Sequence, residues 1–370
     1  MLDGTDGTVR VHTPKFYGKS GSNGNKRWVR ISLVKLDDSW VEIPELLIDA
    51  YRNTVDNTVS ATPKAVSVVN TTEAFRGGGN RAQFDEYLTT GLDTKDAFRS
   101  DLGKPRTNVS RANMRTYATN AGSELLCYEY YKWIFYWNYV IEYANFNSQA
   151  AYNAELTSDG YRQGGLGPGV TDWSNSATSW SGYNGTYPIT PCGYCNDIGN
   201  FTGIKDLVIP ECTATNETDT VATKTFKVPR WRGFDNPFGD IWTNLDGVVI
   251  QRTAANEISS VYTTTNKEEF TDVIGSKTIA GYEVAQDGYI KEFDLGETAE
   301  IIPSSCTGAS ATTYICDYHS CNATSTELHT LLVGGSAYYG GRAGLGYFYS
   351  GNGVGYAASG VGFRTLNRVS

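Results

Sequence analysis

Thiols and one imidazole are grouped at two places in the sequence. Cys192-Gly-Tyr-Cys195 is a Cys-x-x-Cys pair, and Cys316-Asp-Tyr-His319-Ser-Cys321 places two thiols and an imidazole close together. These side chains are ligands that Zn²⁺ prefers. The second spacing is irregular and the two groups lie far apart in sequence, so ordinary thiols are favoured over a zinc site. An odd count of seven cysteines also speaks against a disulfide framework.

Three aspartates in a turn-rich stretch are candidates for acid–base chemistry. Hydrolysis of a polysaccharide needs two carboxyl groups about 5–10 Å apart in a cleft, and Asp235, Asp240 and Asp246 lie close enough in sequence to supply them. Each of the three has turn-forming neighbours, which favours a structural role. A hydrolase acting on surface polysaccharide is therefore the least favoured interpretation.

The C-terminal segment offers no group suited to catalysis. No cysteine follows Cys321, and no Asp, Glu, Lys or His follows His329. A general acid or base needs a side chain that titrates near the operating pH, and tyrosine and arginine do not. The segment therefore suits recognition, and the chain is not expected to be an enzyme or to need a cofactor.

Tyrosine and glycine dominate the same C-terminal segment. The chain has 25 Tyr and 40 Gly, with charged residues at only 19%. Tyrosine gives a large contact area at low entropic cost, as in antibody paratopes, and interleaved glycines would let the backbone take left-handed conformations that expose the rings. The alternative is a glycine-rich core turn in which the tyrosines are buried.

The overall charge argues against nucleic acid as a partner. The net charge is -9 and the pI is about 5.0, whereas phosphate binding needs a stripe of Lys and Arg. The basic clusters are short: Lys26-Arg27, Arg30, and Arg230-Trp-Arg232. Insertion into a membrane is not expected either, because no apolar run approaches bilayer-crossing length.

Alternating stretches near the N-terminus predict a small sheet, and a central block predicts two helices. Val9–Val11, Trp28–Leu33 and Trp40–Ile43 alternate in polarity. Ser110 is a good N-cap for a first helix, and a second is expected from Ser123 to about Gln149. Its apolar residues fall on one broad face, which we interpret as core: Leu125, Tyr128, Tyr131, Ile134, Phe135, Trp137 and Ile141.

The remaining pattern predicts loops and short strands. Residues 160–265 are expected to be dominated by loops, and the glycine-rich residues 164–169 lack the strand and helix that a nucleotide site needs. Short strands are expected at Val249–Gln251, Ser260–Tyr262 and Gly288–Ile290. This order favours an α+β fold over a parallel α/β sheet. We predict a β-rich region over residues 1–105 and a ligand-binding domain over residues 106–370.

Two ordered motifs in the C-terminal half carry a family resemblance. Asn236-Pro-Phe-Gly-Asp-Ile-Trp242 resembles the "N-x-F-G-x-x-W" stretch of the formylglycine-generating-enzyme-like branch of the C-type lectin fold. About a hundred residues later, Val333-Gly-Gly-Ser-Ala337 and Gly362-Phe-Arg364 resemble its closing "G-G-S-W … G-F-R". Ala337 departs from the usual Trp. The reactive cysteines of the oxidase members are missing between the last two elements.

Within that branch the chain is most similar to bacteriophage tail receptor-binding proteins, including those diversified by retroelements. The resemblance implies a C-type-lectin-like domain with twisted antiparallel strands, two helices and long loops. It also implies a host-facing place on the virion tail, a host cell-surface protein or glycan as ligand, contacts with other tail subunits, and a homotrimer. An alternative is a structural tail or capsid-decorating subunit whose lectin-like domain only mediates assembly.

The resemblance also divides the C-terminal residues into two groups. The diversified positions map between Ser336 and Ser359, and within them we expect the ligand-binding residues to be Tyr338, Tyr339, Arg342, Tyr347, Tyr349, Ser350, Asn352 and Tyr356. We expect a second group to support that surface, with Phe238 and Trp242 buried. This structural group comprises Asn236, Phe238, Gly239, Trp242, Gly334, Gly335, Gly362, Phe363 and Arg364.

Overall fold

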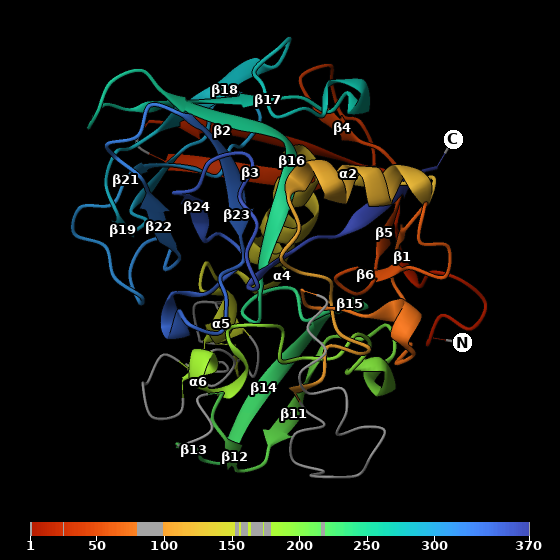
Figure 1. The fold of residues 1–370 in the computed structure, drawn as a ribbon. Helices are drawn as coiled ribbons and strands as arrows, with labels where there is room; N and C mark the ends of the chain where they lie inside the picture. The colour runs from red at the N-terminus through yellow and green to blue at the C-terminus, as the bar shows by residue number, and fades with distance from the viewer. Residues whose placement is uncertain are drawn as a thin grey trace.

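The computed structural model describes residues 2–24, 26–79, 99–151, 155–156, 162–163, 173, 179–215 and 219–369. Strands account for 35% of the chain and helices for 15%, so the fold is of the α+β class. The largest sheet curls into a half-barrel. It occupies the upper part of Figure 1, while a smaller sheet of β11 (Gly203–Ile209), β14 (Lys224–Trp231) and β15 (Phe234–Asp235) lies below.

The large sheet is built around β16 (Trp242–Arg252), which pairs with strands from three later parts of the chain. Nearly every residue of β16 is buried, as expected of a strand covered on both faces. Antiparallel pairs predominate in the sheet. Its order is β18 (Thr278–Glu283), β17 (Ser259–Thr263), β16, β23 (Leu328–Val333), β24 (Phe348–Ser350), β22 (Tyr318–Cys321) and β19 (Gly288–Tyr289), with β25 (Val361–Gly362) parallel to β16.

A second sheet joins the two ends of the described chain. Its order is β1 (Arg10–Thr13), β5 (Leu46–Asp49), β26 (Thr365–Arg368) and β8 (Glu124–Leu125). The last strand, β26, therefore lies between β5 and β8. Phe16, Ile48 and Leu366 belong to one hydrophobic cluster, so residues on both sides of position 105 share a core.

A three-stranded sheet follows the N-terminal alternation. Its order is β3 (Lys26–Ser32), β2 (Phe16–Asn23) and β4 (Val41–Ile43), which places β3 at an edge. Val29 and Ile31 pack against the main core while Lys26 and Arg30 are exposed. The prediction of strands in this region is confirmed.

The first predicted helix is confirmed. Helix α2 spans Arg111–Asn120, and the Ser110 side chain accepts a hydrogen bond from the Asn113 backbone N–H. The second is shorter than predicted, because Ser123–Cys127 is extended and includes β8. The helical stretch runs through α3 (Tyr128–Tyr130), a π-helical segment η3 (Tyr131–Trp137) and α4 (Asn138–Tyr143). It ends where Ala144 takes a left-handed conformation with φ of 49°.

This second helical stretch is buried on nearly all sides. All seven residues of η3 are buried, including Lys132, whose Nζ lies 2.7 Å from a Glu129 carboxylate oxygen and 2.5 Å from one of Glu300. Paired buried charges avoid the large cost of an isolated one. The prediction that the aromatic and apolar residues of this stretch are core is confirmed, except for Ile141, which is 45% exposed.

The prediction that loops dominate residues 160–265 is wrong in its second half. Strands β11 and β14 pair over seven residue positions there. The short strands predicted at Val249–Gln251 and Ser260–Tyr262 are confirmed, because they lie within β16 and β17. Residues 164–169 lie outside the described part of the chain. The other described elements are short: β6 (Thr54–Asp56), β7 (Lys64–Val66), η1 (Glu73–Phe75), α5 (Ser148–Ala151), β9 (Glu155–Leu156), β10 (Arg162–Gln163), α6 (Trp180–Asn184), η6 (Asn196–Ile198), β12 (Cys212–Thr213), β13 (Thr220–Val221), η7 (Lys267–Glu269), β20 (Glu292–Asp294), β21 (Ile302–Ser305) and η8 (Gly340–Arg342).

Among the described residues, no helix combines the length and the apolar character that crossing a membrane requires.

Candidate binding face

Aromatic rings of the tyrosine-rich segment gather around Trp242, the first residue of β16. Its ring centroid lies 5.2 Å from that of Tyr339, 4.7 Å from that of Tyr347 and 5.1 Å from that of Tyr349. Separations of 4.5–7 Å with tilted rings are favourable for aromatic pairs. Trp242 therefore anchors the tyrosine-rich segment directly onto the large sheet.

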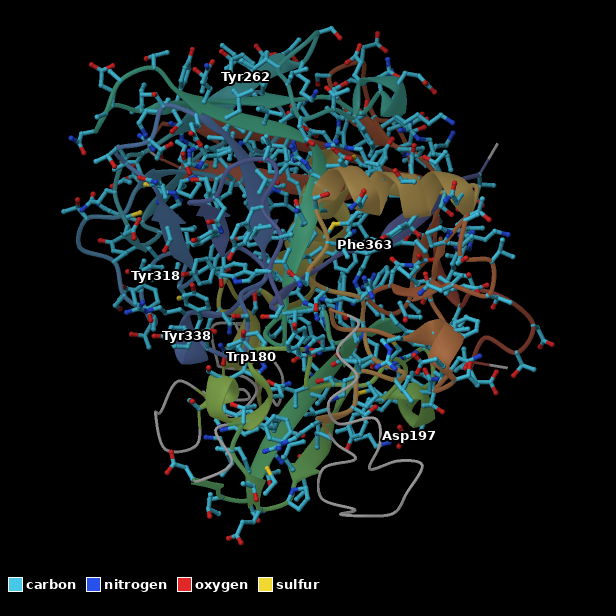
Figure 2. The ribbon with its side chains drawn as sticks, viewed as in Figure 1. Trp180, Asp197, Tyr262, Tyr318, Tyr338 and Phe363 are labelled. Atoms are coloured by element: carbon cyan, nitrogen blue, oxygen red, sulfur yellow. The ribbon has the colours of Figure 1, made fainter. Side chains whose placement is uncertain are left out.

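The ring contacts continue outward from this centre. Tyr347 contacts Tyr318 of β22 at 5.6 Å, and Tyr318 contacts Tyr289 of β19 at 5.1 Å. In the other direction Tyr339 contacts Tyr338 at 5.3 Å. Figure 2 shows Tyr318 and Tyr338 on the same side of the molecule. We call this set the aromatic cluster; it consists of Trp242, Tyr289, Tyr318, Tyr338, Tyr339, Tyr347 and Tyr349.

The eight predicted ligand-binding residues divide by exposure. Tyr338 is 56% exposed, Tyr356 is 36% exposed and Arg342 is exposed. Tyr339, Tyr349 and Asn352 are half-buried. The expectation that the tyrosines of the segment are exposed is confirmed for Tyr338 and Tyr356, holds only in part for Tyr339 and Tyr349, and is wrong for Tyr347. The two residues of the set that are buried are Tyr347 and Ser350.

The burial of Ser350 follows from its place in the sheet, and the burial of Tyr347 follows from the rings that surround it. Side chains of β24 alternate in burial, so Phe348 and Ser350 face inward while Tyr349 faces the surface. The Ser350 hydroxyl hydrogen-bonds to the carboxylate of Glu283 on β18. Tyr347 fills the space between Trp242, Tyr339 and Tyr318, and its hydroxyl lies 3.3 Å from the Ser320 hydroxyl. These two side chains support the surface from beneath.

Burial disfavours the ionisation of four phenols of the cluster. It raises the pKa of Tyr339 to about 12, and it also raises the pKa of Tyr289, Tyr347 and Tyr349. Neutral phenols both donate and accept hydrogen bonds. Arg342 supplies the positive charge of the face: its guanidinium lies 4.5 Å from the centroid of the Tyr318 ring. The exposed surface can therefore stack on a ligand, hydrogen-bond to it and pair with an anionic group.

The two motifs that carry the family resemblance meet in space. The Gly239 backbone N–H donates to the Gly334 carbonyl oxygen at 3.1 Å, and Trp242 and Thr243 pair with Val361 and Gly362. Phe238 is fully buried and Trp242 is 6% exposed, which confirms the prediction that both are buried. The motif around residue 236 and the two C-terminal motifs thus form one support for the aromatic cluster.

Glycine is required at the turn that begins the tyrosine-rich segment. Gly334 and Gly335 have φ of 93° and 72°, values that residues with a side chain rarely adopt. A Cβ at Gly335 would also lie 2.7 Å from the Cβ of Ala343. Any larger residue there would displace the segment that holds Tyr338 and Tyr339.

Two buried arginines hold the support together. The Arg364 guanidinium donates to the carbonyl oxygens of Asp49 at 3.0 Å and Ala50 at 2.8 Å, and also to that of Asp235. Arg52 donates to the Asn236 carbonyl oxygen at 2.7 Å. Burial lowers the pKa of Arg364 to about 9, so it stays charged at neutral pH. Phe363 is fully buried beside it.

Two buried ionisable groups lie behind the tyrosine-rich segment. Asp317 accepts a hydrogen bond from the Gly346 N–H at 2.9 Å, and burial raises its pKa well above the usual range. His319 Nε2 lies 2.9 Å from a Glu283 carboxylate oxygen, and His319 Nδ1 lies 2.8 Å from the Gln286 carbonyl oxygen. His319 with two acceptors is suited to the charged form. Asp317 and His319 thus hold β22 and the loop before β24 in position.

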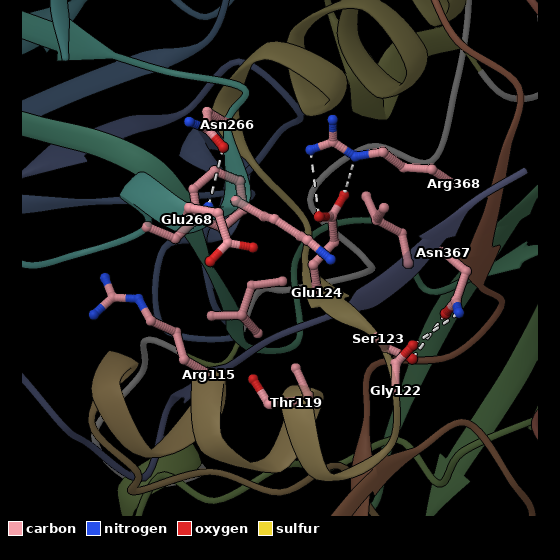
Figure 3. Close-up of a pocket in the computed structure, with 14 residues that line it drawn as sticks. Arg115, Thr119, Gly122, Ser123, Glu124, Asn266, Glu268, Asn367 and Arg368 are labelled. Carbon is pink, nitrogen blue, oxygen red and sulfur yellow. Dashed lines mark hydrogen bonds and ion pairs between the residues drawn. The ribbon is translucent and has the colours of Figure 1, made fainter. Parts of the chain in front are cut away.

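A separate pocket of about 790 Å³ lies beside helix α2 (Figure 3). Its floor is apolar, from Leu125, Phe270 and Leu366, and its rim has both charges. Arg368 on the rim is paired with Glu124 at 2.7 Å. Three distant segments line this pocket, so no local motif in the sequence marks it.

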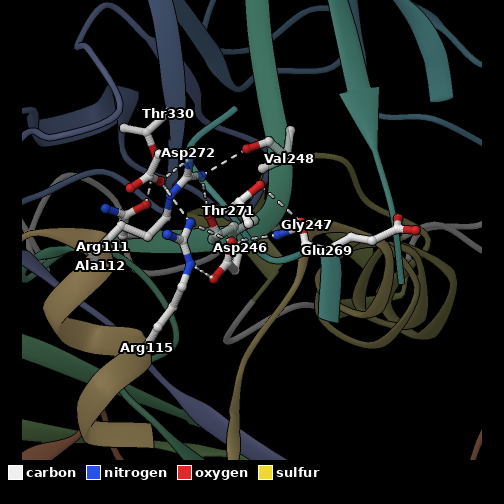
Figure 4. Close-up of polar contacts among 12 residues, drawn as sticks. Arg111, Ala112, Arg115, Asp246, Gly247, Val248, Glu269, Thr271, Asp272 and Thr330 are labelled. Atoms are coloured by element: carbon white, nitrogen blue, oxygen red, sulfur yellow. Dashed lines mark hydrogen bonds and ion pairs between the residues drawn. The ribbon is translucent and has the colours of Figure 1, made fainter. Parts of the chain in front are cut away.

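The three aspartates considered for hydrolysis are buried and engaged in structural contacts. Asp240 accepts hydrogen bonds from the N–H groups of Ile189 at 3.0 Å and Thr190 at 3.1 Å. Asp235 accepts one from the Cys195 N–H at 3.2 Å. The Asp246 carboxylate receives two hydrogen bonds from Arg115, which also pairs with Asp272 (Figure 4).

The thiols considered for zinc binding lie in separate surroundings. Cys192 Sγ lies 3.5 Å from the Arg52 carbonyl oxygen, and Cys195 Sγ lies 3.6 Å from the Val228 carbonyl oxygen. Cys316 and Cys321 are half-buried. Within the described part of the chain, no three His, Cys, Asp or Glu side chains are grouped so that they could hold a metal ion.

Tyr289 and Tyr318 were missed by the sequence-based prediction of the face. They precede the tyrosine-rich segment by 20 residues or more. Tyr318 is brought to the segment by the pairing of β22 with β24, and Tyr289 by the pairing of β19 with β22. Trp242 was predicted, but only as a supporting residue. No family model matches this sequence, and a comparison with curated proteins finds no match.

Proposed function

We propose that this chain is a receptor-binding protein of a bacteriophage tail, which attaches the virion to a ligand on the host cell surface through its aromatic cluster. The observation that carries the proposal is the arrangement around Trp242. Tyr338, Arg342 and Tyr356 are exposed on a support of buried rings and glycine turns. Clustered exposed tyrosine and arginine are typical of binding hot spots.

The chemistry of this face favours recognition over catalysis. The eight predicted contacts include no Asp, Glu, His, Lys or Cys, and Arg342 is the charged residue among them. Such a surface suits a ligand that presents flat or apolar groups for stacking together with hydroxyl, carbonyl or acidic groups. Both a glycan and a protein loop meet that description, so the ligand is proposed as a host surface protein or glycan.

A C-type-lectin-like fold and a homotrimer are part of the same proposal. The joined motifs at residues 236–242, 333–337 and 362–364 support the fold assignment, because their order and contacts suit a lectin-like domain whose closing strands hold a long binding segment. The trimer rests on the family resemblance. We place the protein on the host-facing part of the tail and, after release, outside the cell.

The proposal is tested by comparing exposed tyrosines on and off the face. Labelled chains with Tyr338→Ala, Arg342→Ala or Tyr356→Ala are mixed with intact cells of a panel of bacterial strains, and bound label is measured. The matched control is Tyr282→Ala, a 46% exposed tyrosine on β18 that is not part of the aromatic cluster. Melting temperature is recorded for every variant.

We expect the three variants on the face to lose at least about 2 kcal/mol of binding free energy if each is a hot spot, with unchanged melting temperature. Tyr282→Ala should bind like the parent chain. Failure of the parent chain to bind any strain, while it co-assembles with tail subunits, would instead support a structural role in the virion.

A further inference from the structure

Residues 8–36 contain seven Lys and Arg residues and no Asp or Glu, in a chain whose net charge is -9. Four of the seven cations pair with carboxylates from elsewhere: Arg10, Lys15, Lys19 and Lys35. No ion pair joins Lys26 or Arg30 to a carboxylate among the described residues. Both belong to β3, so uncompensated positive charge lies on that strand.

The register of the hairpin places these cations on one face. Lys26, Trp28 and Arg30 are opposite Asn23, Gly21 and Lys19 of β2, and the other face, with Val29 and Ile31, packs on the core. The Arg30 guanidinium lies 4.6 Å from the centroid of the Trp28 ring. Lys26 and Arg30 are four residues apart, about 13 Å along an extended strand.

β3 is also an edge. In the part of the chain that the structure describes, its backbone pairs with β2 alone. The hydrogen-bonding groups on its outer side can therefore receive another strand. Charged residues on an edge keep identical edges apart, but they also select a strand of opposite charge.

Large apolar side chains just after the end of this strand are exposed. Leu33 is 75% exposed, Val34 is 61% exposed and Leu36 is 65% exposed. Exposed apolar side chains that are contiguous mark interaction sites, whereas scattered ones do not. The free edge, the cations and the apolar end thus belong to one stretch, residues 26–36.

We propose that β3 binds an extended segment of a partner protein, which adds as a strand to its free edge. The segment has acidic side chains four residues apart, facing Lys26 and Arg30, and an apolar residue that covers Leu33, Val34 and Leu36. Main-chain hydrogen bonds supply affinity in this mode, and alternate side chains supply specificity. This inference does not rest on the proposed receptor-binding function, because β3 contributes no residue to the aromatic cluster.

The test uses the full chain and a fluorescent synthetic peptide. In this peptide threonine occupies every second position, two glutamates lie four residues apart, and valine occupies the position between the glutamates and the corresponding position after them. Binding is measured by anisotropy, and hydrogen exchange of the amides of residues 26–32 is followed with and without peptide. A peptide with lysine in place of glutamate, and polygalacturonate as an anionic glycan, are tested in parallel. The variant is Lys26→Glu/Arg30→Glu, and the matched control is Lys64→Glu/Lys267→Glu, which changes two exposed lysines elsewhere.

We expect the glutamate peptide to bind and to slow exchange across residues 26–32. Lys26→Glu/Arg30→Glu should weaken binding at least tenfold, and Lys26→Gln/Arg30→Gln should do so with less electrostatic disturbance of the fold. The control should bind like the parent chain.

Three results would overturn the proposal. The first is equal binding of the lysine peptide. The second is binding of polygalacturonate that depends on Lys26 and Arg30 while the glutamate peptide gives no amide protection, which would show a glycan surface. The third is a change of sedimentation from oligomer to monomer in the double variant without peptide, which would show an interface between copies.

Discussion

The indole ring of Trp242 meets the phenol ring of Tyr347 edge to face, with centroids 4.7 Å apart and an angle of 73° between the planes. Trp242 begins the central strand of the large sheet, and Tyr347 belongs to the tyrosine-rich segment. Tyr347 has no exposed surface and Trp242 has 6%. This contact therefore joins the support and the face.

Removing either ring should destabilise the fold. We expect Trp242→Ala and Tyr347→Ala each to lower the free energy of unfolding by about 3–5 kcal/mol, as for large aromatic residues in cores. A double-mutant cycle should give a coupling of about 0.5–1.5 kcal/mol between the rings. Tyr338→Ala, at a 56% exposed position, serves as the control and should change stability by less than about 0.5 kcal/mol. Additive costs in the cycle would show that the two rings do not interact.

Arg364→Lys should be poorly tolerated because the guanidinium serves three carbonyl oxygens. A lysine ammonium cannot reproduce that fork, and each buried group left without a partner costs about 1–3 kcal/mol. The matched control is Arg368→Lys, which alters the ion pair between the 37% exposed Arg368 side chain and Glu124 and should cost about 1 kcal/mol at most. Urea denaturation of the two variants measures the difference, and equal costs would contradict the structural role of Arg364.

Alkaline pH should weaken the fold through His319. Burial opposes the imidazolium, but hydrogen bonds with Cys306 and Glu283 and the attraction of the Glu283 carboxylate outweigh it and raise the pKa of His319 from 6.5 to about 10. The charged histidine therefore stabilises the fold fully below pH 6.5, and that contribution is lost as the pH rises toward 10. His319→Gln should lack this decline in denaturation curves recorded at pH 6, 8 and 10. An unchanged pH slope in the variant would assign the decline to other groups.

Asp317 should lower the stability of the fold as the pH rises, unlike an ordinary surface carboxylate. Burial raises its pKa, opposed by the hydrogen bond from the Gly346 N–H, so the folded chain disfavours the ionised form, whereas the unfolded chain ionises it near its usual pKa of about 3.9. Its presence therefore costs stability increasingly as the pH rises above that value. We expect Asp317→Asn to be more stable than the parent at pH 8 but not at pH 4. An equal difference at the two pH values would contradict this account.

Local patterns in the sequence predicted the elements that depend on near neighbours. The Ser110 cap, the alternating N-terminal strands and the aromatic helix could be predicted because each depends on spacing within a few residues. The burial of Phe238 and Trp242 could be predicted from the motif they form. Loops were predicted where β11 and β14 lie, because these strands are interrupted by polar residues and pair across an intervening segment.

The remaining features depend on contacts between distant segments. The burial of Tyr347 depends on Tyr318, which reaches it through a strand pairing that no local pattern reveals. The same holds for Tyr289. The exposed and the buried rings of the tyrosine-rich segment are all tyrosines, so the residue type does not distinguish them. Only their positions relative to Trp242 do.

The position of β26 has a consequence for synthesis of the protein. Because β26 lies between β5 and β8, that sheet remains open until residues 365–368 have left the ribosome. Those residues directly follow the tyrosine-rich segment, so a frameshift or a premature stop within that segment also removes the strand that closes the sheet. Truncated products would then be left with two unsatisfied strand edges and exposed to proteolysis. Only chains in which the binding segment was translated in full can therefore close this sheet.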